Sequence, residues 1–199
     1  MNIDSQYHLN TIVLAGGKST RMGRDKALIP IQGVPMLQLI CNIAEACTGK
    51  VYIVTPWPEH YQELLTPNSQ FIREVPLPGE TGNEPRTHGP LVGFMQGLAA
   101  VDTNWVLLLA CDLPNLRVEI LQNWMSQLET IPENKMAALV QNNHKWQPLC
   151  GFYRRRCLPE LTQYIKQGGR SFQQWLKPDS VHILPLLDTQ MLFNFNNEI

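Results

Sequence analysis

The chain has 199 residues, of which 16 are lysine or arginine and 17 are aspartate or glutamate. This near-zero net charge lacks the broad positive field of nucleic-acid-binding proteins, so we expect no nucleic-acid partner. No apolar run approaches the roughly 20 residues of a membrane-spanning helix, and we therefore expect no membrane association and a cytoplasmic location. The length suits one domain over residues 1–199, with residues 1–9 as a flexible tail.

The five cysteines occur without a CxxC pair or metal-ligand spacing. In an intracellular protein this pattern indicates reduced thiols that pack in the core. We expect no structural zinc site.

Apolar runs of strand length alternate with segments of helical spacing, which is typical of βα units and a mainly parallel sheet. A Pro- and Gly-rich segment, residues 76–90, should form a loop. The first half of the chain predicts strands at 11–15, 51–55 and 71–75, and helices at 35–47 and 59–65.

The run at 105–110 is wholly apolar, as expected of a strand buried on both faces at the centre of a parallel sheet. The whole pattern predicts an α/β fold of three layers, an α/β/α sandwich. The remaining predicted elements are helices at 91–101, 118–128, 158–166 and 172–176, strands at 136–141, 148–153, 181–184 and 192–195, and a turn at 142–145.

The loop after the first strand, LAGGKSTRMGRDKAL (14–28), combines two glycines with four cations. Gly16 and Gly17 would let main-chain N–H groups wrap an anion, and the cations would neutralise a polyphosphate. The spacing is not that of a P-loop, which needs a glycine where Ile12 stands, and it does not fit G-x-G-x-x-G. A solvated basic loop is the alternative interpretation of this segment alone.

A carboxylate, Asp112, comes just after the strand at 105–110. Such a group can hold Mg²⁺ together with phosphate oxygens and water, or it can simply cap a turn. Ligands of open α/β sheets bind beyond the carboxyl ends of the strands, where this loop and the cationic loop would meet. The pair therefore predicts a metal–nucleotide site.

These segments resemble the molybdenum cofactor guanylyltransferases, within the wider nucleotidyltransferase fold that also makes nucleotide sugars. The loop at 14–28 is similar to the family's signature loop, and GPLVG (89–93), CDLP (111–114) and NFN (194–196) agree in order and spacing. The resemblance implies a Rossmann-like, nucleotide-diphospho-sugar transferase-like fold. It also implies transfer of GMP from GTP to the terminal phosphate of molybdopterin, with release of pyrophosphate.

The same resemblance implies the site residues. Arg21 and Lys26 would stabilise charge on the transferring phosphate, and Asp112 would coordinate Mg²⁺. The pair Asp25-Lys26 after R-M-G resembles the guanylyltransferase version and favours GTP over CTP. Asn194 and Asn196 would lie on the acceptor side. The implied nucleotide-binding residues are Leu14, Ala15, Gly16, Gly17, Lys26, Glu74 and Asp112, with Glu74 as the nearest candidate for the acid that holds guanine.

Some features leave alternatives open. The chain has Gln147 before Pro148, where the family commonly has a basic residue or histidine. His88 is given no role, and Arg170-Ser171 either faces the pterin or lets Ser171 cap the next helix. The expected partners are GTP and molybdopterin, with transient contact with other molybdenum cofactor proteins. The alternatives are a relative that uses CTP or another acceptor such as a sugar phosphate, and a non-catalytic nucleotide-binding regulator.

Overall fold

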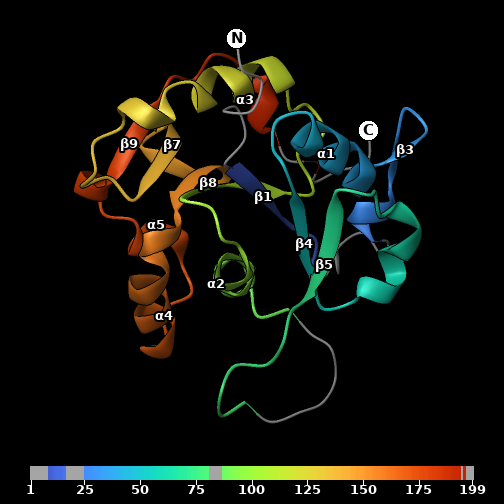
Figure 1. The fold of residues 1–199 in the computed structure, drawn as a ribbon, viewed down its shortest axis with the longest axis horizontal. Helices are drawn as coiled ribbons and strands as arrows, with labels where there is room; N and C mark the ends of the chain where they lie inside the picture. The colour runs from blue at the N-terminus through green and yellow to red at the C-terminus, as the bar shows by residue number, and fades with distance from the viewer. Residues whose placement is uncertain (1–8, 17–24, 81–86, 194, 196–199) are drawn as a thin grey trace.

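A seven-stranded sheet in the order β5-β4-β1-β6-β8-β7-β9 forms the centre of the molecule (Figure 1). The structure is a computed structural model that describes residues 9–16, 25–80, 87–193 and 195. The strands are β1 (Leu9–Leu14), β4 (Val51–Thr55), β5 (Ser69–Arg73), β6 (Trp105–Ala110), β7 (Ala137–Asn142), β8 (Lys145–Arg154) and β9 (Val181–Leu184). Only β8 runs antiparallel to its neighbours, β6 and β7, so the sheet is mostly parallel, as predicted.

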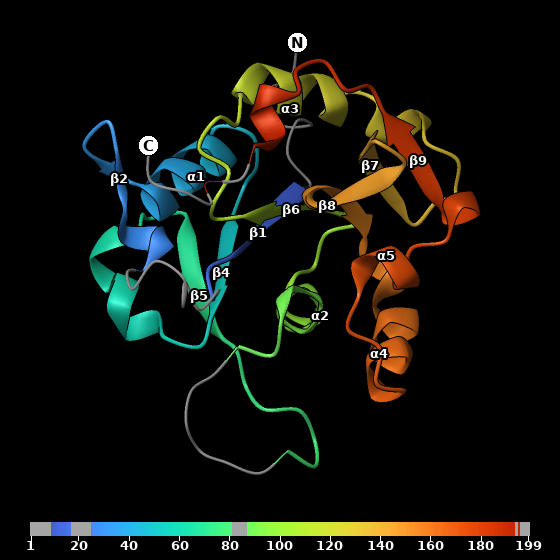
Figure 2. The same ribbon diagram turned by 180° about the vertical axis from the view of Figure 1, so that it is seen from behind.

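Helices cover both faces of the sheet (Figures 1 and 2). One face carries α1 (Met36–Glu45) and α3 (Val118–Met125), and the other carries α2 (Pro90–Ala100), α4 (Leu158–Lys166) and α5 (Phe172–Trp175). Strand β6 feeds both cores, because Leu107 and Leu109 pack on one side and Val106 and Leu108 on the other. The three-layer sandwich is therefore confirmed. Within the described ranges, no helix combines the length and apolar character needed to cross a membrane.

Two local predictions need correction, and one further element was not predicted. The segment expected as an α-helix at 59–65 is a 3-10 helix, Pro58–Leu64. The strand expected at 192–195 is wrong, because the chain forms a 3-10 turn at Gln190–Leu192 with Met191 buried. A short hairpin of β2 (Pro30–Ile31) and β3 (Val34–Pro35) was not expected.

The order of the strands places a topological switch point between β1 and β6. From β1 the chain adds β4 and then β5 on one side, and it later returns to add β6 on the other side. The connections after β1 and β6 therefore run to opposite sides, which in open α/β sheets is the place where ligands bind, at the carboxyl edge of the sheet. This is where the fold favours ligand binding.

The five cysteines are free thiols, and four of them are buried, whereas Cys111 is partly buried. Burial raises the pKa of Cys41 and of Cys150 to about 12. These thiols are packing groups, as the sequence indicated.

Helix α2 approaches the sheet most closely at Gly97. A Cβ there would lie 2.9 Å from both Ile12 Cγ2 and Val54 Cγ2. We expect Gly97→Ala to lower the free energy of unfolding by about 1–3 kcal/mol, measured by chemical denaturation. Gly93→Ala, one turn earlier, is the matched control because its Cβ would meet neighbours no closer than 3.5 Å. Equal stability of the two variants would contradict the close packing at Gly97.

Candidate active site

Two oppositely charged side chains meet at the switch point. Lys26 begins a 3-10 helix, Lys26–Leu28, after the first loop, and Asp112 follows β6. Their closest atoms, Lys26 Nζ and Asp112 Oδ2, are 3.8 Å apart, and about a fifth of each side chain is exposed, 20% and 22%. Burial raises the pKa of the Asp112 carboxyl, and the nearby Lys26 ammonium opposes that rise. A cation and a carboxylate are thus held together in partly desolvated surroundings.

Local hydrogen bonds explain the position of Lys26. Asp25 caps the 3-10 helix, because its Oδ1 accepts from the Ala27 main-chain N–H at 3.0 Å. The other carboxylate oxygen, Oδ2, accepts from the Tyr61 hydroxyl at 2.5 Å. The two hydrogen bonds of Asp25 therefore connect the start of this 3-10 helix to the segment that follows β4. They fix the main chain directly before Lys26.

The main chain at the end of β1 runs close to the end of β4. The N–H of Ala15 donates to the carbonyl of Val54 at 2.9 Å, which extends the pairing of the strands. A Cβ at Gly16 would lie 3.0 Å from Pro56 Cδ and 3.5 Å from Glu74 Oε2. Glycine at this position lets the main chain pass close to an acidic side chain.

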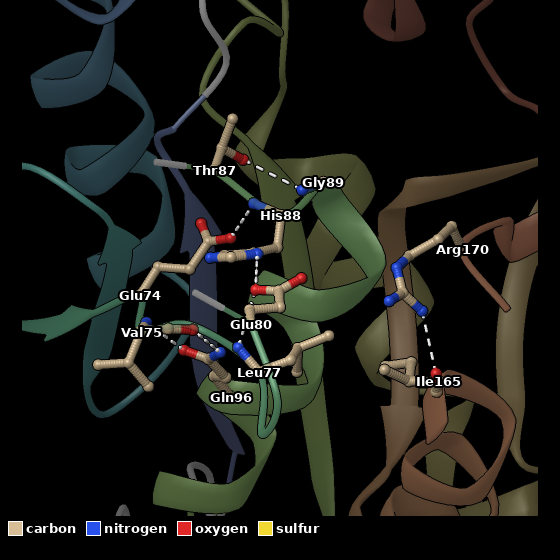
Figure 3. Close-up of polar contacts among 10 residues, drawn as sticks. All are labelled: Glu74, Val75, Leu77, Glu80, Thr87, His88, Gly89, Gln96, Ile165 and Arg170. Carbon is tan, nitrogen blue, oxygen red and sulfur yellow. Dashed lines mark hydrogen bonds and ion pairs between the residues drawn. The ribbon is translucent and has the colours of Figure 1, made fainter. Parts of the chain in front are cut away.

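That acid, Glu74, directly follows β5. Its N–H donates to the Thr55 carbonyl at 2.9 Å, and the residue is 6% exposed. Oε1 accepts from the main-chain N–H of His88 at 2.5 Å (Figure 3). Oε2 would be 3.7 Å from a Cβ at Gly93, so it lies close to two glycines, Gly16 and Gly93. Burial raises the pKa of the Glu74 carboxyl, and the His88 N–H opposes this.

The donor set at the switch point fits magnesium brought in by a nucleotide. In the described part of the chain, no three His, Cys, Asp or Glu side chains gather to form a metal cage. Mg²⁺ does not need one, since it binds through one or two carboxylates together with phosphate oxygens and water. Asp112 would offer one hard oxygen ligand. Its neighbour Cys111 does not compete, because burial raises the pKa of that thiol to about 12 and keeps it protonated.

Four of the predicted site residues, Gly17, Arg21, Asn194 and Asn196, lie outside the described residues. The residue between the two asparagines, Phe195, is described, and its N–H donates to the carbonyl of Asp112 at 2.9 Å. This contact places Phe195 against the Asp112 loop. The structure thus places Leu14, Ala15, Gly16, Lys26, Glu74 and Asp112 at the carboxyl edge of the sheet.

Sequence reasoning missed two residues that border Glu74. The Nδ1 atom of His88 lies 2.8 Å from Glu80 Oε2, and the His88 side chain is 5% exposed (Figure 3). The only sequence signal is the position of His88 directly before the GPLVG motif. Its partner in the 76–90 loop could not be found from spacing.

In the segment between α4 and α5, the structure shows the expected cap at Ser171. Ser171 Oγ accepts from the N–H of Gln174, so Ser171 caps α5, although the bond is long at 3.4 Å. Arg170 Nη1 donates to the carbonyls of Ile165 at 2.9 Å and Gly169 at 2.7 Å. Figure 3 shows the Arg170 guanidinium and its bond to Ile165.

Residues 11–181 match the MobA-like NTP transferase domain. The chain belongs to this family. A relative from Nostoc sp. named "probable molybdenum cofactor guanylyltransferase" is 57% identical, over 95% of this chain and 86% of its own. One of the same name from Synechococcus elongatus is 42% identical, over 93% and 92%. The solved structure of molybdopterin-guanine dinucleotide biosynthesis protein A from Archaeoglobus fulgidus shares the fold, with a TM-score of 0.72 at 19% identity over 94% and 92%.

The family membership identifies this chain as a nucleotidyltransferase and confirms the resemblance found in its sequence. Members of the family typically use a divalent metal ion. The alternative of a non-catalytic nucleotide-binding regulator is accordingly set aside. The Lys26–Asp112 pair and the Glu74 carboxylate are candidates for the groups that hold the nucleoside triphosphate.

Proposed function

We propose that this enzyme transfers GMP from GTP to the terminal phosphate of molybdopterin, with Mg²⁺, to form the guanine dinucleotide cofactor and pyrophosphate. The observation that carries the proposal is the Lys26–Asp112 pair, 3.8 Å apart at the switch point of the sheet. The 57% identity to a protein named as a molybdenum cofactor guanylyltransferase supports the choice of substrates. The free thiols support the cytoplasm as its compartment.

No protein nucleophile is needed for this reaction. A phosphate oxygen of molybdopterin attacks the α-phosphorus of GTP, the new P–O bond forms, and the bond to pyrophosphate breaks. Because both substrates are anions, the barrier comes from repulsion and from charge on the leaving oxygens. Lys26 is placed to donate to a triphosphate oxygen, and Asp112 would hold the metal. The bound magnesium would neutralise part of the triphosphate charge.

Glu74 is suited to read the base. A carboxylate accepts two parallel hydrogen bonds, and guanine offers N1–H and its 2-amino group side by side, whereas cytosine presents an acceptor beside its amino group. Among the described residues, Glu74 Oε1 is bonded to His88 and Oε2 makes no hydrogen bond. Because each carboxylate oxygen has two lone pairs, Oε1 keeps one acceptor site and Oε2 keeps both, so the two oxygens can still accept from the two guanine donors.

We assign the acceptor side to Asn194 and Asn196, and charge stabilisation beside Lys26 to Arg21. The bond from Phe195 to the carbonyl of Asp112 supports the first assignment, since it places Phe195, the residue between the two asparagines in sequence, at the loop that would hold the metal.

The function is tested by pyrophosphate release from the purified enzyme. GTP and CTP are each supplied with molybdopterin, with a sugar phosphate, or with no acceptor. We expect turnover only when GTP and molybdopterin are supplied together. Equal turnover with CTP would remove the assignment of the base, and equal turnover with a sugar phosphate would remove the assignment of the acceptor.

Replacing Glu74 with glutamine should change the stability of the fold and the recognition of GTP in opposite directions. Since burial raises the pKa of Glu74 in the folded protein, ionisation of this group destabilises the fold above its folded-state pKa. Glu74→Gln should therefore melt at a higher temperature than the wild type at pH 7, and the gain should vanish when the pH falls below the ordinary pKa of glutamate. Its kcat/KM for GTP should fall. A variant that is less stable at pH 7 would contradict this account.

A further inference from the structure

The two ends of the long loop between β5 and α2 are joined by side chains. At the first end, Leu77 to Glu80 form a tight turn in which the N–H of Glu80 donates to the Leu77 carbonyl at 3.0 Å. Gly79 allows this turn, with a φ of 89°. Glu80 Oε2 accepts from the Leu77 N–H at 3.0 Å and lies 2.8 Å from His88 Nδ1. Glu80 thus links the start of the loop to its end.

His88 in turn contacts the acid proposed to read the base. Its main-chain N–H donates to Glu74 Oε1 at 2.5 Å, and its imidazole lies between the carboxylates of Glu74 and Glu80 (Figure 3). Beyond His88 comes Gly89, with a φ of 91°, which favours glycine. The tie between His88 and Glu80 therefore holds the main chain just before this turn, and with it the N–H that fixes Oε1.

The other imidazole nitrogen indicates that this arrangement does not serve stability. His88 Nε2 is buried and has no hydrogen-bond partner in the described part of the chain. A buried polar atom without a partner destabilises a fold, and an apolar side chain of similar size would avoid the cost.

The main chain beside Glu74 is held independently of His88. The side-chain amide of Gln96, on α2, accepts from the N–H of Val75 at 2.9 Å and donates to its carbonyl at 2.8 Å. The Glu74 N–H is bonded to Thr55 as part of the sheet edge. These bonds do not fix the rotation of the Glu74 carboxylate. The hydrogen bond from the His88 N–H to Oε1 does.

We propose that His88, oriented by Glu80, is a positioning residue that sets base selectivity by holding the Glu74 carboxylate in the orientation that meets both guanine donors. This inference rests on the proposed reading of guanine by Glu74. Glu80 and His88, from the two described ends of the 76–90 loop, then tune recognition of the purine without being part of the Lys26–Asp112 pair.

The test compares GTP with inosine triphosphate, which lacks the 2-amino group. The ratio of their kcat/KM values reports how well Glu74 meets both guanine donors. We expect His88→Leu and Glu80→Gln each to lower this ratio about tenfold, the value of a hydrogen bond to a charged group. His88→Asn should keep most of it, because the Asn amide nitrogen can take the place of Nδ1. The double variant Glu80→Gln/His88→Leu should lose no more than His88→Leu.

Two matched controls and a melting curve accompany each variant. His182→Leu on β9 and Glu63→Gln, an exposed residue of the Pro58–Leu64 turn, should keep the wild-type ratio. If Glu80→Gln and His88→Leu also keep it, while Glu74→Gln lowers it, the role of His88 is overturned and the reading by Glu74 stands. If the wild type and Glu74→Gln have the same GTP-to-inosine-triphosphate ratio of kcat/KM, Glu74 does not read the base. The inference about His88 is then overturned as well. If His88→Leu does not fold, the ratio measured for Glu80→Gln decides the question, because Glu80 is partly exposed and its replacement should leave the fold intact.

Discussion

Replacing Asp112 with asparagine is expected to lower the rate of nucleotidyl transfer about a thousandfold. Asparagine keeps the size of the side chain but removes the negative charge, so the metal loses its protein ligand. Burial raises the pKa of the Asp112 carboxyl, and the ionised group therefore costs stability. The variant should fold at least as well as the wild type. Pyrophosphate release at saturating GTP and molybdopterin measures the loss.

A matched control for this variant lies at the opposite end of the same strand. Asp102 is exposed and precedes β6, whereas Asp112 follows it. Asp102→Asn should retain the wild-type rate. Titration calorimetry of GTP with and without Mg²⁺ adds a readout independent of turnover, because Asp112→Asn should lose the enhancement of binding by the metal. A fully active Asp112→Asn enzyme would remove the metal role from this residue.

The sequence predicted those elements whose burial follows directly from a run of apolar residues. The wholly apolar run at 105–110 predicted a strand buried on both faces, and β6 has this burial at every position. The parallel order then placed the loops after β1 and β6 at one edge, which is why Lys26 and Asp112 could be paired before the structure was known. Hydrophobic pattern and strand direction were sufficient for this step.

The features that the sequence did not predict depend on contacts between residues that neither helical nor strand periodicity connects. The apolar residues at 192–195 suggested a strand, but a short apolar run is ambiguous, and Met191 instead turns into the core. The contact of Glu80 with His88 spans a loop and needs the turn at Gly79. The hairpin of β2 and β3 needs a positive φ at Gln32, where glycine or asparagine would have been the expected signal.

Replacing Lys26 with alanine is expected to reduce kcat/KM for GTP on the order of a hundredfold, about 3 kcal/mol of transition-state stabilisation. The ammonium lies beside Asp112, where the phosphates of a metal-bound nucleotide would sit. Both the affinity for GTP and the rate should fall, since a cation stabilises the bound triphosphate and the charge that develops on pyrophosphate. Lys50→Ala, an exposed lysine just before β4, is the control and should be unaffected. Unchanged affinity together with an unchanged rate would contradict the assignment.

The pH dependence of the Lys26 variants separates two ways in which this lysine could act. Its charge lowers the pKa of the Asp112 carboxyl against the rise caused by burial. Without the charge, that pKa moves up, and the acidic limb of the pH–rate profile of Lys26→Ala should move to higher pH. Lys26→Arg keeps the charge and should restore the limb, but a planar guanidinium does not place its donors where an ammonium does. If Lys26→Arg also recovers the full rate, the lysine acts through its field on Asp112, and direct contact with the phosphates is not required.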